Sequence, residues 1–232
     1  MGDVGIVIAA GGRGRRMGGG VPKQFMTLAG QCIITRVVKP FASTGAVTQI
    51  VVVVPPRFIE LTRRMLRRQG WKKTITVVAG GRDRQESVWN GLEAFTVKPE
   101  IVLVHDAVRP FVTKELIRRV ITMTRRYRAV VVAVPVTDTI KLEGVEGFAG
   151  RTVDRSRLWS AQTPQGFQYE TLVRAERAAR RSGYRGTDEA SLVERLRVPV
   201  RIVRGEPGNI KITTKTDMDL AYAFAKKWKR ER

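Results

Sequence analysis

The sequence of 232 residues has one cysteine, one histidine and no long hydrophobic run. Cys32 cannot form a disulfide within the chain, so nothing points to an oxidising compartment. No apolar run approaches the roughly 18 residues that cross a bilayer, and the first one, Val4–Ala10, follows no cationic leader. We therefore expect a cytoplasmic protein with no membrane partner.

Acidic residues are also scarce: 21 Asp and Glu stand against 43 Lys and Arg, which gives a formal net charge of +22. Such a balance suggests nucleic-acid binding. However, much of the excess falls at helical spacing within residues 63–68, 118–126 and 174–181, and no zinc-finger, RRM or KH signature is present. We interpret these runs as solvated helix faces and expect no nucleic-acid partner. A basic nucleic-acid-binding protein is the alternative from a different class.

Short β-branched runs alternate with longer amphipathic segments along the chain. Three of the runs are almost continuously apolar, as expected where helices cover both faces of a parallel sheet. The predicted strands are Val4–Ala10, Gln49–Val54, Thr74–Ala79, Ile101–His105, Ala129–Val134 and Val200–Val203, and the predicted helices are Ile33–Ala42, Phe58–Arg68, Arg84–Phe95, Thr113–Tyr127, Tyr169–Arg181, Asp188–Leu196 and one from Asp217. The pattern predicts an α/β fold with a doubly wound, mostly parallel, Rossmann-like sheet in one domain, residues 1–232.

The alternation is interrupted after Pro135. Val136–Lys141 and Arg151–Asp154 flank a stretch punctuated by three glycines. This pattern is typical of a β-hairpin, and we interpret residues 136–156 as a protruding arm. A surface meander is the alternative.

A glycine-rich, cationic loop follows the first predicted strand, between Gly11 and Lys23. Glycine allows backbone N–H groups to close around phosphate oxygens. The loop is not a Walker A motif, because Pro22 and Gln24 flank Lys23, and it is not a dinucleotide fingerprint, because Met17 stands where a glycine is needed. Its glycines and cations, Gly11, Gly12, Gly14, Arg15, Arg16 and Lys23, suit a nucleoside triphosphate. A flexible surface loop is the alternative.

Two further segments carry candidate site residues. Asp106 ends the fourth predicted strand, where a lone carboxylate suits Mg²⁺ beside phosphate oxygens, or else caps the loop. His105 alternates away from Asp106, so we expect it to be packed, with no catalytic role. Gly80 and Gly81 enter a predicted helix and allow a flat base to approach backbone amides. The segment from Asn209 to Thr213 by itself predicts an ordinary strand.

Nine ordered blocks, AAGGRGRRM, PKQF, GGRDRQES, VHDAVRP, DTIK, TVDR, TPQGF, TDEAS and NIKIT, extend over nearly the whole chain. In these blocks the sequence resembles the 4-diphosphocytidyl-2-C-methyl-D-erythritol synthases, which are cytidylyltransferases of the non-mevalonate isoprenoid pathway. The resemblance implies a nucleotidyltransferase that converts CTP and 2-C-methyl-D-erythritol 4-phosphate to 4-diphosphocytidyl-2-C-methyl-D-erythritol and pyrophosphate. A ribitol-5-phosphate or other polyol-phosphate cytidylyltransferase is the alternative.

The resemblance also implies roles for individual residues. Arg16 and Lys23 would be catalytic and contact the triphosphate, and Asp106 would lie by Mg²⁺ and the substrate. The nucleotide would be bound by Ala10, Gly11, Gly12, Gly14, Arg15, Gly80, Gly81, Ser87 and Ala107. The acceptor would be bound by Asp106, Arg109, Thr139, Arg155, Thr163, Thr187 and Lys211. The family is dimeric, so the resemblance implies a homodimer whose arm brings Thr139 and Arg155 into the partner's site.

Overall fold

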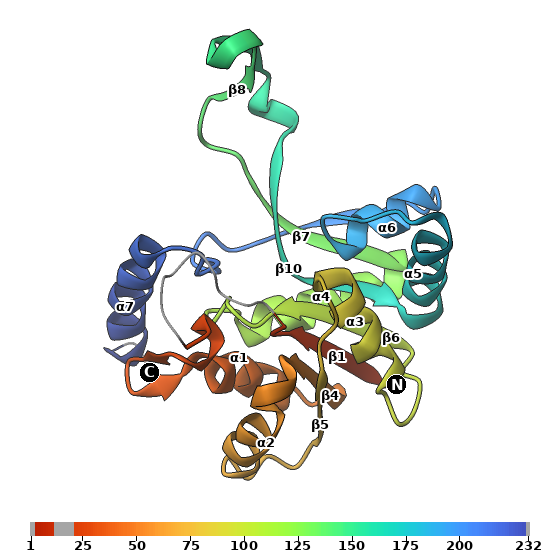
Figure 1. Cartoon of the computed structure of the whole chain (residues 1–232), viewed down its shortest axis with the longest axis vertical. Helices are drawn as coiled ribbons and strands as arrows, with labels where there is room; N and C mark the ends of the chain where they lie inside the picture. The colour runs from red at the N-terminus through yellow and green to blue at the C-terminus, as the bar shows by residue number, and fades with distance from the viewer. Residues whose placement is uncertain (1–2, 12–20, 231–232) are drawn as a thin grey trace.

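A seven-stranded sheet, covered by helices on both faces, forms the body of the protein, and a thin hairpin protrudes from it (Figure 1). The structure is a computed structural model that describes residues 3–11 and 21–230, the last four of these by their backbone alone. The described part of the chain contains no helix that is long and apolar enough to span a membrane.

Strands and helices alternate through most of the chain. The strands are β1 Val4–Ala9, β2 Thr27–Leu28, β3 Gln31–Cys32, β4 Val47–Val54, β5 Thr74–Ala79, β6 Ile101–Asp106, β7 Ala129–Pro135, β8 Ile140–Glu143, β9 Ala149–Val153, β10 Trp159–Gln168 and β11 Arg201–Arg204. The helices are α1 Ile33–Ala42, α2 Ile59–Arg67, α3 Arg84–Glu93, α4 Lys114–Tyr127, α5 Tyr169–Ser182, α6 Glu189–Arg195 and α7 Lys215–Arg230, with 3-10 turns η2 Lys23–Phe25, η3 Pro56–Phe58, η4 Val145–Gly147 and η5 Arg155–Arg157.

The strand order in the large sheet is β11-β7-β10-β6-β1-β4-β5. All neighbours are parallel except β10, which runs antiparallel between β6 and β7. The chain moves outward from β1 to β4 and β5 and then returns to β6 on the other side of β1. The sheet therefore has its topological switch point between β1 and β6, which is where ligands bind in open α/β sheets.

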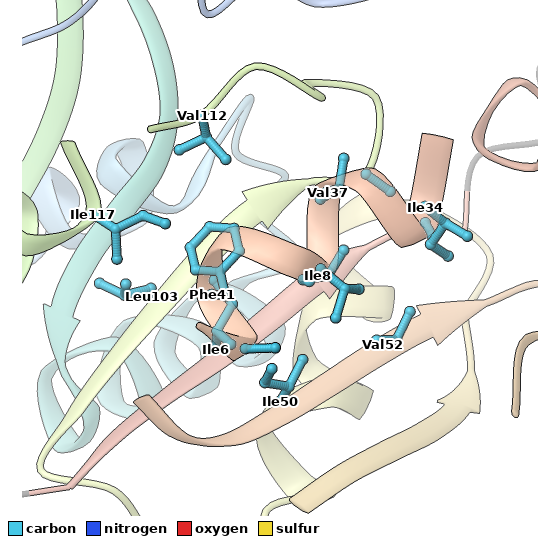
Figure 2. Close-up of a cluster of buried hydrophobic side chains, with 14 of the residues drawn as sticks. Ile6, Ile8, Ile34, Val37, Phe41, Ile50, Val52, Leu103, Val112 and Ile117 are labelled. Carbon is cyan, nitrogen blue, oxygen red and sulfur yellow. The ribbon is translucent and has the colours of Figure 1, made fainter. Parts of the chain in front are cut away.

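The hydrophobic core has two halves, one on each face of the sheet. Along β1, Ile6 and Ile8 face one half, whereas Val7 faces the other. Figure 2 shows part of the first half, in which Phe41 of α1 lies over Ile6 and Ile50. Since both faces are buried, β1 and β4 are apolar along almost their whole length.

The predicted α/β fold with a mostly parallel sheet is confirmed, and so is the hairpin arm. Two predictions were wrong or incomplete. The segment from Asn209 to Thr213 is not a strand; it is a loop whose Ile212 N–H bonds to the Val108 carbonyl at 2.9 Å. In addition, no strand was predicted from the sequence at β10, a ten-residue strand in the middle of the sheet.

The arm is an extension of the connection between β7 and β10. Its strands β8 and β9 pair with each other and form a separate two-stranded sheet (Figure 1). At its tip Val145 and Phe148 are 80% and 74% exposed. Large apolar side chains at the end of a projecting hairpin are typical of a surface that contacts another molecule.

Candidate active site

A hollow of about 350 Å³ opens at the carboxyl ends of β1 and β6, at the switch point of the sheet. β1 supplies Ala9 and the two residues after it, and β6 supplies Asp106. The entrance to α3 forms the opposite wall. The lining residues are Ala9, Ala10, Gly11, Gln24, Gly81, Arg82, Asp83, Arg84, Ser87, Asp106, Ala107, Val108 and Lys211. Five of the residues that the sequence assigns to the nucleotide are among them: Ala10, Gly11, Gly81, Ser87 and Ala107.

The wall between β1 and α3 depends on glycine at two positions. A Cβ added to Gly11 would lie 2.8 Å from the Ser87 hydroxyl, and one added to Gly80 would lie 3.0 Å from the same atom. Ser87 donates to the Asp83 carbonyl at 2.7 Å and accepts from the Gly81 N–H at 3.0 Å. Gly80 therefore packs behind the wall, whereas Gly81 and Ser87 face the hollow.

A second hollow, of about 230 Å³, lies beside the first. Its lining includes five residues that the sequence assigns to the acceptor, namely Asp106, Arg109, Thr163, Thr187 and Lys211. Three residues, Arg84, Asp106 and Lys211, line both hollows. The two spaces thus share a wall made of one carboxylate and two cations.

Asp106 is the centre of that wall. Its carboxylate receives Lys211 Nζ at 2.9 Å, Arg84 Nε at 3.2 Å and Arg109 Nε at 3.7 Å. Burial opposes ionisation of this carboxyl, but the charges of Arg84, Lys211 and Arg109 outweigh burial and hold the pKa of Asp106 well below its usual range. Asp106 is therefore a carboxylate at all physiological pH values, and it fixes the cations that face the substrates.

Arg84 joins this cluster to α6. Its two terminal nitrogens bind the Glu189 carboxylate at 2.6 and 3.0 Å, while its Nε binds Asp106. The Glu189 side chain is 1% exposed and the Arg84 side chain 31% exposed, so the carboxylate of this pair is buried. The sequence analysis singled out neither residue, although each lies in one of the ordered blocks. The sequence signal that could have identified Arg84 as a site residue is its place in the block GGRDRQES, together with Gly80 and Gly81.

Hydrogen bonds below the second hollow hold Thr163 and Arg109 in place. The Thr163 hydroxyl accepts from the Asp106 N–H at 3.1 Å and lies 3.0 Å from His105 Nδ1. His105 Nε2 lies 3.1 Å from the Arg109 carbonyl. His105 is fully buried and stacks obliquely on Phe41, as expected for a packed side chain. Burial lowers the pKa of His105 to about 4, so the ring is neutral and its Nε2 carries the proton that reaches Arg109.

The Arg109 guanidinium is largely engaged by the protein itself. It donates to the carbonyls of Asn209 at 2.8 Å and Ala161 at 3.3 Å. Asn209 in turn donates to the Thr163 carbonyl at 2.8 Å. Arg109 thus ties the loop that carries Lys211 to strand β10.

Lys23 differs from the expectation of an exposed loop cation. It lies in η2 and is 9% exposed, and its ammonium donates to the carbonyls of Ile212 and Thr213. The next residue, Gln24, lines the first hollow and donates to the Ala10 carbonyl at 2.6 Å. The PKQF block therefore anchors both the end of β1 and the loop after Lys211. Its burial could not be read from the sequence, because the partners are distant backbone carbonyls.

Of the remaining predicted residues, the two that the structure describes line neither hollow. Thr139 and Arg155 are exposed on the arm, where Arg155 donates to the Thr137 carbonyl. Gly12, Gly14, Arg15 and Arg16 lie outside the described residues. Within the described part of the chain, no group of three or more His, Cys, Asp and Glu side chains could hold a metal ion. A cation at Asp106 would therefore need most of its ligands from a bound molecule.

Two adjoining hollows with a shared, cation-rich wall suit the transfer of a group between two phosphorylated ligands. The larger one is a glycine-walled space that a flat base and sugar can enter, and the smaller one is lined by hydroxyls and cations. The hydroxyl beside Asp106, that of Thr163, pairs with His105, but burial lowers the pKa of this imidazole to about 4, so the ring is a weak base that does not activate a nucleophile. The arrangement therefore favours direct transfer without a covalent enzyme intermediate.

Comparison with known proteins agrees with this geometry. A family model described as 2-C-methyl-D-erythritol 4-phosphate cytidylyltransferase matches residues 4–227. A relative of that name from Symbiobacterium thermophilum is 47% identical over 218 residues, which are 94% of this chain and 91% of the relative. The solved structure of the 4-diphosphocytidyl-2C-methyl-D-erythritol synthase from Anaerococcus prevotii has a TM-score of 0.87 at 26% identity, covering 97% of this chain and 96% of that one. The corresponding Thermus thermophilus structure has a TM-score of 0.78 at 33% identity, covering 95% and 98%.

Proposed function

The chain belongs to the 2-C-methyl-D-erythritol 4-phosphate cytidylyltransferase family, and from this premise we propose how its residues divide the work of the reaction. The protein is a nucleotidyltransferase that joins the cytidylyl group of CTP to 2-C-methyl-D-erythritol 4-phosphate and releases pyrophosphate, a step of non-mevalonate isoprenoid biosynthesis. The observation that carries our assignment of roles is the wall of Arg84, Asp106 and Lys211 shared by the two hollows.

CTP occupies the larger hollow in this proposal. The cytosine and ribose lie against Gly81, Ser87 and Ala107, while Gly80 keeps the wall thin enough for them. The triphosphate lies toward Ala10 and Gly11 and the loop that follows, where Gly12, Gly14, Arg15 and Arg16 bind its oxygens. Lys23 stabilises charge on the reacting phosphate, for which its ammonium would leave the carbonyls of Ile212 and Thr213.

The acceptor occupies the smaller hollow, between Thr163, Thr187, Arg109 and Lys211. A phosphate monoester has a second pKa of about 6, so it is largely a dianion at neutral pH and needs no protein base to attack. One of its oxygens attacks the α-phosphorus of CTP in line with the leaving pyrophosphate. Lys211 stands at the boundary between the two hollows, where the new bond forms, and Asp106 holds its ammonium there. Catalysis is chiefly positioning and charge stabilisation.

Nucleotidyltransferases of this family are generally dependent on a divalent metal, and we propose Mg²⁺ as the ion. Mg²⁺ usually keeps few protein ligands and binds phosphate oxygens. Asp106 already pairs with three cations, which supports a metal that enters as the CTP complex, with Asp106 as its single protein ligand. The ion would offset the phosphate charge that opposes the approach of the two substrates.

We further propose that residues 1–232 form one nucleotidyltransferase domain that works in the cytoplasm as a homodimer. Residues 136–156 would be the dimerisation arm, placing Thr139 and Arg155 in the partner's acceptor hollow. The exposed apolar tip of the arm and its extension away from the body support this arrangement (Figure 1). Arg155 would bind the acceptor phosphate, for which its planar guanidinium is well suited.

Pyrophosphate release tests the whole assignment. Each nucleoside triphosphate is measured against a panel of polyol phosphates that includes 2-C-methyl-D-erythritol 4-phosphate and ribitol 5-phosphate, with Mg²⁺ or excess EDTA. We expect turnover with CTP and methylerythritol phosphate, and none in EDTA. A preference for ribitol phosphate would move the protein to the other acceptor, and full activity in EDTA would exclude the metal. Salt-sensitive retention on DNA without turnover would favour the nucleic-acid alternative.

A further inference from the structure

Glu176 of α5 is a carboxyl buried behind the active site. Its side chain is fully buried, and neither carboxyl oxygen has a hydrogen-bond partner among the described residues. It lies on the face of α5 that packs into the protein, beside Leu172, Val173 and Ala179. A buried polar group without partners is costly, and a buried charge without partners is much more so. The site described above gives this residue no role.

A second buried carboxyl, Glu189, lies on helix α6, which packs against α5, and its charge acts on Glu176. The Arg84 guanidinium hydrogen-bonds Glu189 and not Glu176. Both terminal nitrogens of Arg84 bind Glu189, and its Nε binds Asp106, so each of its nitrogens is paired with a carboxylate other than Glu176. Ionisation of Glu176 is opposed by its burial, by the lack of a bound counter-charge and by the charge of the Glu189 carboxylate. The geometry therefore leaves Glu189 ionised and Glu176 with a proton.

We propose that Glu176 is a positioning residue of the cytidylyl transfer: its proton keeps Glu189 bound to Arg84, and Arg84 in turn holds the Asp106 carboxylate in the wall between the two substrates. Loss of the proton puts a second negative charge beside Glu189. The repulsion displaces Glu189 from Arg84, and Arg84 then loses the fixed position from which it reaches Asp106. The enzyme is thereby disabled at alkaline pH, because the wall shared by the two hollows loses the fixed position of Arg84.

The groups around Glu176 set the pH at which it loses its proton. Burial and the Glu189 charge raise the pKa of Glu176 to about 8, against the opposing effects of Gln85 and Arg84 of α3 and of Arg180 on α5 itself. Gln85 stabilises an ionised Glu176 only weakly, because its amide also interacts with the Tyr184 carbonyl at 3.5 Å and the Gly186 N–H at 3.1 Å. The folded protein thus binds a proton that the unfolded chain has released between about pH 4.5 and 8.

The test compares kcat/KM for pyrophosphate release from pH 6.5 to 9.5 in the wild type, Glu176→Gln and Glu170→Gln, each normalised to its own maximum. Glu170 is an exposed acid in the first turn of the same helix and is the matched control. We expect the wild type and Glu170→Gln to lose activity above about pH 8, by roughly tenfold per pH unit once the group is ionised. Glu176→Gln should lack this alkaline limb. If Glu176→Gln does not fold, Glu176→Met serves in its place.

Urea unfolding of the same proteins provides a readout that does not depend on the proposed roles in catalysis. Because the pKa of Glu176 is higher in the folded state, its contribution to stability falls as pH rises from about 4.5 to 8. The stability of Glu176→Gln relative to the wild type should therefore increase from pH 5 to pH 9, whereas that of Glu170→Gln should not. An alkaline limb that persists in the neutral variant, its absence from the wild type, or a constant stability difference would each overturn the proposal. If unfolding behaves as expected but no cytidylyl transfer is measured, the roles in catalysis fail and the buried proton stands.

Discussion

Thr163 and His105 share a hydrogen bond beneath the acceptor hollow, with 3.0 Å between the Thr163 hydroxyl oxygen and His105 Nδ1. The same hydroxyl accepts the Asp106 N–H, so its own proton points to the imidazole. A neutral ring is required for this arrangement, because a protonated Nδ1 would be a donor and could not accept. The single histidine thus orients a residue of the site while remaining outside it.

The first prediction concerns this histidine. Its pKa is lowered in the folded state, so the unfolded chain binds more protons between about pH 6.5 and 4, and the His105 contribution to stability is lost as pH falls through that window. We expect the wild type to lose stability relative to His105→Gln, which does not titrate, by on the order of 3 kcal/mol between pH 7 and 4. Urea unfolding at each pH measures this difference. Glu176 titrates with the opposite sign in an overlapping window, so only the difference between the two proteins is diagnostic. A constant difference would show that His105 is not held neutral.

The second prediction separates Lys23 from Arg16. Removal of a cation that stabilises the transition state commonly costs about 10²–10³ in rate, so both Lys23→Ala and Arg16→Ala should lower kcat strongly. The buried bonds from Lys23 to the carbonyls of Ile212 and Thr213 add a stability cost, of about 1–3 kcal/mol, for Lys23→Ala. Arg16→Ala, a substitution in what the sequence predicts to be a surface loop, should change stability by less than about 0.5 kcal/mol. Pyrophosphate release measures kcat and urea unfolding measures the free energy of unfolding of each variant. Near-normal turnover in either variant would show that its residue is not catalytic.

A third prediction follows from the cations around Asp106. Asp106→Asn keeps the shape of the side chain but leaves Lys211, Arg84 and Arg109 with one negative charge fewer, so kcat/KM should fall by about 10²-fold or more. Stability should fall by about 3 kcal/mol, because Arg109 is then a buried cation without its ion pair. Asp219→Asn, on the exposed side of α7, is the matched control and should lower neither kcat/KM nor stability. Since the pKa of Asp106 is held well below its usual range, this carboxyl should cause no loss of wild-type activity between pH 7 and 5.

The fourth prediction tests the arm. We expect Lys23→Ala and Arg155→Ala subunits each to be nearly inactive, and the experiment mixes them in equal amounts after dissociation. If Arg155 acts in the partner's site, each mixed dimer has one site with both residues and one with neither, so random mixing restores about a quarter of wild-type activity.

The control for this experiment mixes Lys23→Ala with Arg16→Ala. Both residues would serve the site of their own chain, so every site lacks one of them and no activity should return. Recovery in the control as well would point to exchange artefacts. No recovery in the main experiment, with subunit exchange confirmed by labelled chains, would return Arg155 to its own subunit.

The sequence predicted the parallel part of the fold well because apolar runs such as Thr74–Ala79 and helix periods such as Ile33–Ala42 match the observed bounds. β10 was missed because its buried positions Gln162, Thr163 and Gln165 are polar and serve the site instead of the core. Its Gly166 reads as a turn residue, yet it is required by packing: a Cβ there would lie 2.2 Å from the Thr124 hydroxyl of α4.

The site was predictable to the extent that its residues fall in ordered blocks. Lys211, Thr163 and Thr187 line one hollow although they are distant in the sequence, and only the resemblance brought them together. Local pattern could not reveal the ion pair of Arg84 with Glu189, since the two residues are 105 positions apart. It could not reveal the proton on Glu176 either, because burial and the neighbouring charge arise only in the folded chain.

Strand β10 begins where the arm ends and carries Gln162, Thr163 and Gln165 only a few residues later. Contacts made by the arm and contacts made by an acceptor therefore bear on the same rigid backbone. If the contacts of the arm favour a particular position of β10, they change the affinity for an acceptor whose contacts depend on that position. Thermodynamic linkage makes the effect reciprocal. If the arm holds a second subunit as proposed above, an acceptor that tightens this hold must itself be bound more tightly by the assembled pair. Occupancy of the hollow and the assembly equilibrium would then vary together with protein concentration.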